Sequence, residues 1–89
     1  MYFANDSDLY RIIGKNIKYY REKSKLTQIQ LADLSGISIS YLSKIEADGC
    51  NKSLSISVLN EIANALNIEI IHFFKEDFLN EIKWGKKKN

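Results

Sequence analysis

Five residues between positions 39 and 47 would share one side of an α-helix. With about 100° of rotation per residue, this arc holds Ile39, Ser40, Ser43, Lys44 and Ala47. The side chains are short or basic, and none of them is acidic. Hydroxyl and ammonium groups on such a face would reach base edges in a major groove without repelling phosphates. A solvated helix face has the same composition, so the arc alone leaves both interpretations open.

The preceding residues supply a scaffold that would hold this helix in place. Thr27 and Gln30 have the spacing of a capping box, which predicts the start of a short helix. Gly36 would end that helix, because glycine adopts positive φ without strain. Ser38 is a suitable N-cap for the next helix.

The apolar positions of the same stretch indicate how its two helices would pack. The expected buried residues are Leu31, Ala32, Leu34, Ile37, Leu42 and Ile45. Helices joined by a short turn cross steeply, and Ala32 supplies the small side chain that close contact requires. An ordinary helical hairpin needs similar residues, but the small, turn and apolar positions together favour a DNA-binding helix-turn-helix.

Residues that match a known family extend well beyond this motif. The matches are Leu26-Thr27-Gln28, Leu31-Ala32, Ser35-Gly36-Ile37-Ser38 and Tyr41-Leu42-Ser43-Lys44-Ile45-Glu46, with others at Ile13–Lys18, Arg21-Glu22, Leu59, Glu61–Ala63, Ala65-Leu66 and Phe73-Phe74. On these residues the chain closely resembles the lambda-repressor-like helix-turn-helix family, the phage repressor and Cro type often called Xre. The resemblance implies a compact, all-α, five-helix DNA-binding domain with a C-terminal helical extension.

The chain of 89 residues is long enough for one domain. We expect a flexible arm at 1–7, a DNA-binding domain at 8–75 with its motif at 27–47, and a C-terminal extension at 76–89 that serves dimerisation and ends in a basic tail. Ser7 or Asp8 would cap a first helix, Ser55 would cap a fourth, and a fifth would begin near Glu69. The expected buried stripes are Leu9, Ile13, Ile17 and Tyr20 in the first helix and Ile56, Leu59, Ile62, Ala63 and Leu66 in the fourth, which Asn67 would end.

Composition argues against several other classes of protein. The single cysteine, Cys50, allows no internal disulfide and no Cys-rich zinc site. A redox role is one interpretation of this residue, but an ordinary loop cysteine is the stronger one. No apolar run reaches membrane-spanning length, and the N-terminus lacks the order of a signal peptide. We therefore expect a cytoplasmic protein. No catalytic, cofactor-binding or metal-ligating arrangement is evident, and His72 has no ligand partner nearby in sequence.

The resemblance implies which residues meet double-stranded DNA. In relatives, the residues that match Gln28, Ile39, Ser40 and Lys44 face the duplex. Gln28 would hold a phosphate, Lys44 would contact guanine or a phosphate, and Ile39, which departs from relatives with Gln here, would contact a thymine methyl group. The remaining DNA-binding candidates are Ser38, Ser43, Tyr41, Asn51 and Lys52. For Tyr41, packing against the fourth helix is an equal alternative.

Two further sets of residues carry expectations about structure and assembly. Arg21 and Glu46 match a pair that ties the first helix to the recognition helix, although both could be exposed instead. Ile71, Phe74, Phe78 and Ile82 recur at helical spacing and would form a homodimer interface. The alternatives for this stripe are packing over its own core or contact with a protein partner.

The sequence therefore predicts a DNA-binding transcriptional regulator, and more specifically a homodimeric repressor of a palindromic operator. An antitoxin of a toxin–antitoxin pair and a controller of a restriction–modification operon remain alternatives in the same class. A protein-interaction module that has lost DNA binding is the alternative in another class, because the net charge is only +2. An enzyme is not expected.

Overall fold

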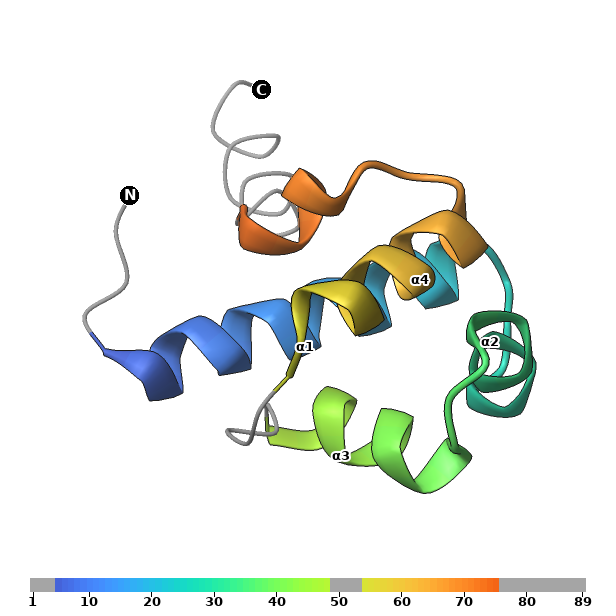
Figure 1. The fold of residues 1–89 in the computed structure, drawn as a ribbon, viewed down its shortest axis with the longest axis horizontal. Helices are drawn as coiled ribbons and strands as arrows, with labels where there is room; N and C mark the ends of the chain where they lie inside the picture. The colour runs from blue at the N-terminus through green and yellow to red at the C-terminus, as the bar shows by residue number, and fades with distance from the viewer. Residues whose placement is uncertain (1–4, 49–53, 76–89) are drawn as a thin grey trace, which may run out of the picture.

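The computed structural model describes residues 5–48 and 54–75. Its elements are α1 (Asp6–Lys23), α2 (Gln28–Ser35), α3 (Ile39–Asp48), α4 (Ile56–Leu66) and a 3-10 helix, η1 (Ile70–Phe74). These two ranges contain no strand, so the predicted all-α class is confirmed. Helix α1 packs against α3 and η1, while α2 closes one end of the molecule against α3 and α4 (Figure 1).

The first helix begins earlier than the sequence predicts. The Asn5 side chain, not that of Ser7 or Asp8, is the N-cap, and its Oδ1 accepts a hydrogen bond from the Asp8 N–H at 2.9 Å. Asparagine is as good a cap as serine or aspartate, and Asp6 and Asp8 then fall in the first turn, where the helix dipole favours acids. The predicted arm over 1–7 is therefore wrong for 5–7, and 1–4 lie outside the described residues.

The core lies where α1, α2, α3 and α4 converge. Its buried apolar residues are Ile13, Ile17, Leu31, Ala32, Leu42, Ile45, Leu59, Ile62, Ala63, Leu66 and Phe73. Two predicted members are wrong, because Leu34 is 61% and Ile56 is 68% exposed. In α2 the polar Ser35 takes the buried position. In α4 the first residue, Ile56, lies about 70° from the centre of the buried stripe.

The expected fifth α-helix is replaced by η1 in the described residues. Phe73 is fully buried at its centre, and the side-chain amide of Asn16 in α1 donates to the carbonyls of Phe73 and Lys75. A continuing α-helix would need the Phe73 carbonyl for a backbone N–H four residues later, and here Asn16 binds it. Residues 76–89, with the predicted extension and basic tail, lie outside the described part of the chain.

Candidate nucleic-acid interface

Local hydrogen bonds and one left-handed residue define the ends of the two helices in the motif. The Thr27 hydroxyl accepts from the Gln30 N–H at 3.1 Å, and the Gln30 amide oxygen accepts from the Thr27 N–H at 2.8 Å, so the capping box is confirmed. Gly36 has φ 73°, in the left-handed region that ends the helix without strain. The Ser38 hydroxyl accepts from the Tyr41 N–H at 3.0 Å, which caps α3 as predicted.

Helix α3 has one buried side and one open side. Leu42 and Ile45 are fully buried, which anchors the helix on the core. On the other side Ile39 is 40% exposed, and Ser40 and Lys44 are also exposed. Of the two other arc residues, Ala47 is exposed and Ser43 is half-buried. No other part of the described chain covers this face, so a groove of a duplex could approach it.

An ion pair joins α1 to α3 beside this face. The Arg21 Nε donates to Glu46 Oε2 at 2.8 Å, and its Nη2 donates to Oε1 at 3.0 Å. The pair is buried, because the Arg21 side chain is 10% and the Glu46 side chain 2% exposed. Arg21 Nη1 also donates to the Leu26 carbonyl at 2.7 Å, so one guanidinium links α1, the following loop and α3.

The Gln28 side chain also makes contacts within the domain. Its Nε2 donates to Glu46 Oε1 at 3.0 Å, and its Oε1 accepts from the Ser43 hydroxyl at 2.9 Å. Both hydrogen bonds bridge α2 and α3, so the predicted phosphate contact competes with partners that are already in place. Sequence reasoning missed this bridge, because no helical periodicity relates residues on two different helices.

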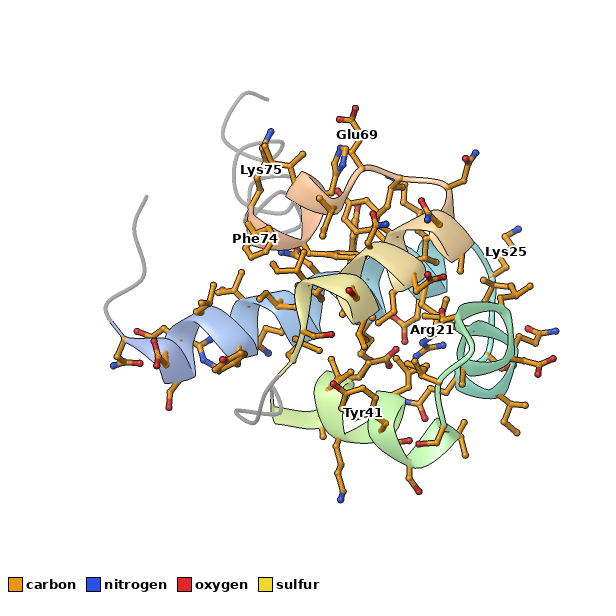
Figure 2. All side chains as sticks on the ribbon, in the orientation of Figure 1. Arg21, Lys25, Tyr41, Glu69, Phe74 and Lys75 are labelled. Carbon is orange, nitrogen blue, oxygen red and sulfur yellow. The ribbon has the colours of Figure 1, made fainter. Side chains whose placement is uncertain are left out.

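The remaining candidates fall into two groups. Tyr41 is half-buried, packs against the core and lies on the side of α3 that faces α4 (Figure 2), and its contact with a phosphate stays a prediction. Ile71 is 49% exposed in η1, while Phe74 is half-buried against the core. Five of the residues singled out from the sequence lie outside the described ranges, namely Cys50, Asn51, Lys52, Phe78 and Ile82.

His72 makes its contacts within the domain. His72 contacts the Glu69 carbonyl through Nδ1 at 3.1 Å and meets the Tyr20 ring edge-on, at 5.7 Å between ring centres. Across 5–48 and 54–75, no group of three or more His, Cys, Asp or Glu residues is placed to hold a metal ion. Among the same residues, no helix has both the length and the apolar character to cross a bilayer.

Together, the four-helix core and the short turn that joins α2 to α3 define a helix-turn-helix domain, with α3 in the place of the recognition helix. A family model described as helix-turn-helix matches residues 17–73. The chain belongs to this family, in its lambda-repressor-like (Xre) branch.

Individual relatives agree with this assignment. An immunity repressor protein of Bacillus phage phi105 is 43% identical over 67 residues, which are 75% of this chain and 45% of the phage protein. Control protein C.SmaI of Serratia marcescens is 33% identical over 63 residues, 71% of this chain and 73% of that protein. This chain therefore spans less than half of the phage repressor but nearly three quarters of the control protein.

A solved structure supports the fold independently. The crystal structure of the restriction-modification controller protein C.AhdI from Aeromonas hydrophila superposes with a TM-score of 0.67 at 31% identity. The match covers 73% of this chain and 96% of that one.

Proposed function

We propose that this chain is a sequence-specific transcriptional regulator that inserts α3 into the major groove of duplex DNA. One observation carries the proposal: Ile39, Ser40 and Lys44 lie exposed on one side of α3, whereas Leu42 and Ile45 on the other side are fully buried. A helix anchored in this way is held rigidly, and its open face is short enough to approach base edges.

The residues of the open face have distinct proposed roles. Lys44 donates to guanine or to a phosphate, and Ser40 donates to or accepts from a base edge. Ile39 packs on a thymine methyl group, which favours an A·T pair at that position. Two residues flank the face, Ser38 and Tyr41, and two follow α3 along the chain, Asn51 and Lys52. We propose that these four residues contact the DNA backbone.

Assembly and mode of action extend the same proposal. A homodimer would place its two α3 helices about 34 Å apart, one turn of DNA, and would read a palindromic operator. Ile71 and Phe74, followed by Phe78 and Ile82, are the proposed interface, because Ile71 is half exposed in η1. Bound across a promoter in the cytoplasm, such a dimer represses by excluding polymerase.

Sedimentation of Phe78→Glu tests the interface, with Ile29→Glu on the exposed side of α2 as the control. If the Phe78→Glu variant has the same mass in solution as the parent protein, the proposed interface is wrong.

The test of DNA binding compares two exposed lysines. The purified protein is mixed with a random-sequence duplex at low salt, and a duplex selected from that pool is then titrated. We expect Lys44→Ala to weaken binding to the selected duplex about tenfold or more. Lys75→Ala removes the same charge on the side of the molecule opposite α3 (Figure 2), so its affinity should match that of the parent.

Salt separates this proposal from a pure protein-interaction module. Affinity should fall as salt rises, with a slope of about −0.9 per phosphate contacted, because binding releases counterions. No retardation of any duplex at low salt, or equal losses for the two lysine variants, would contradict the proposed function.

A controller of a restriction–modification operon is the second candidate. It is favoured by two similar controller proteins, C.SmaI at 33% identity and C.AhdI at 31% identity with a TM-score of 0.67. The proposed DNA contacts are the same for both candidates. A reporter gene downstream of the selected duplex distinguishes them, because a controller can raise expression whereas a pure repressor lowers it.

A further inference from the structure

The Gln28 side chain belongs to a polar network between α2 and α3. All of its hydrogen bonds that the structure shows lie within this network. The Ser43 hydroxyl donates to Gln28 Oε1 at 2.9 Å, and Gln28 Nε2 donates to Glu46 Oε1 at 3.0 Å. The Glu46 carboxylate is in turn held by Arg21. The network therefore runs in one direction, from a hydroxyl through an amide to a carboxylate that a guanidinium neutralises.

The chemistry of these partners fixes the orientation of the amide. Gln28 Oε1 faces a hydroxyl and Nε2 faces a carboxylate. A flipped amide could still bond the Ser43 hydroxyl, which accepts as well as donates, but its oxygen would face the Glu46 carboxylate and lose that bond. One amide hydrogen is used by Glu46, and the only hydrogen of the Ser43 hydroxyl is used by Gln28. The position of the Gln28 side chain is thus set by α3 and not by the solvent.

The two attachment points explain what the network does to α3. Ser43 and Glu46 are three residues apart, so Gln28 is joined to α3 at two points almost one turn apart. Two such bonds resist rotation of α3 about its own axis. Gln28, at the first residue of α2, therefore supports the direction in which Ser40 and Lys44 point, in addition to the burial of Leu42 and Ile45.

We infer that Gln28 is a positioning residue of the DNA interface: through Ser43 and Glu46 it sets the rotation of α3 and hence which bases Ser40 and Lys44 meet, and it does not act by holding a phosphate. The inference rests on the proposed function. It also assigns Ser43 to the support of α3, and it leaves Ile39, Ser40 and Lys44 as the residues that read the bases.

A double-mutant cycle on DNA binding tests the inference. The probes are a duplex selected from a random pool with the parent protein and a scrambled duplex of the same length and composition. Fluorescence anisotropy over a range of salt concentrations gives the affinity of Gln28→Ala, Ser43→Ala and the double variant. Thermal melting establishes that each variant is folded at the assay temperature.

If Gln28 acts through Ser43, the effects of the two substitutions are coupled. We expect each single variant to bind the selected duplex about tenfold more weakly, and the double variant to lose little more than Gln28→Ala. Affinity for the scrambled duplex and the salt slope should stay close to those of the parent, because no phosphate contact is removed. Ser40→Ala deletes the same hydroxyl on the exposed face, so its effect should multiply with that of Gln28→Ala.

The opposite results separate the inference from the proposed function. Losses that multiply to about a hundredfold in the double variant, or a salt slope shallower by about 0.9 with equal losses on both duplexes, would overturn the positioning role alone. A parent protein that retains no duplex at low salt would overturn the proposed function as well. If Gln28→Ala does not fold, Ser43→Thr, which keeps the hydroxyl, should bind like the parent while Ser43→Ala does not, and equal affinities for these two would also overturn the inference.

Discussion

Removal of the Glu46 carboxylate should destabilise the domain strongly, because it leaves the Arg21 guanidinium buried without its main partner. The Arg21 side chain is 10% exposed and makes two hydrogen bonds to Glu46, at 2.8 and 3.0 Å. Breaking one side of a buried pair costs about 3–5 kcal/mol. We expect the lower end for Glu46→Ala, because Arg21 keeps its bond to the Leu26 carbonyl and the Glu22 carboxylate lies 3.8 Å away.

A loss of about 3 kcal/mol is large for a domain of this size. Domains are stable by roughly 5–15 kcal/mol in total, and each kcal/mol shifts Tm by about 4–8 °C. Glu46→Ala should therefore lower Tm by about 12–24 °C. Thermal unfolding followed by circular dichroism measures the shift, at one protein concentration so that any change in assembly does not enter the comparison.

Neighbouring substitutions provide the controls for Glu46→Ala. Lys44→Ala lies on the exposed face of the same helix and should change the free energy of unfolding by less than about 0.5 kcal/mol. Glu22→Ala should be similarly mild, because the Glu22 side chain is 58% exposed. The double variant Arg21→Met/Glu46→Leu should recover much of the loss, since no buried charge remains unpaired. Equal melting temperatures for Glu46→Ala and Lys44→Ala would refute the reasoning.

Three other substitutions have expected outcomes of different size. Gly36→Ala should cost about 1–2 kcal/mol from positive φ alone, because nothing lies within 4 Å of the added Cβ; thermal melting would contradict this if Ala were neutral. Asn16→Ala should lower the free energy of unfolding by about 2–3 kcal/mol and speed amide exchange in the 3-10 helix, because two carbonyls lose their donor. Unchanged exchange there would count against this role of Asn16. In α4, Ile62→Ala should cost about 2–5 kcal/mol and Ile56→Ala less than about 0.5, since the first is fully buried and the second 68% exposed; similar costs in urea unfolding would disagree.

Local features of the chain were predictable from the sequence wherever neighbouring residues decide them. The Thr27–Gln30 capping box and the left-handed Gly36 each depend on bonds or backbone angles within a few positions. The same holds for the Ser38 and Ser55 caps. The competing Asn5 cap was missed because several good N-caps stand side by side, and local preference does not rank them.

Burial was predictable only at the centre of each apolar stripe. Leu42, Ile45 and Ile62 are fully buried as expected, whereas Leu34 and Ile56, at the edges of their stripes, are exposed. A helical wheel gives the direction in which a side chain points, but the position of the next helix determines whether that side is covered. The wheel therefore leaves edge positions undecided.

The sequence by itself determined the helix-turn-helix, its caps, the centre of its core and the open face of α3, because these follow from periodicity and local hydrogen bonding. Only the tertiary structure decided what Gln28 and Asn16 contact. Gln28 joins Ser43 and Glu46 on another helix, and Asn16 binds carbonyls more than fifty residues away, where η1 replaces a longer helix. Such contacts depend on how separate elements come together in space, and no spacing along the chain encodes that arrangement.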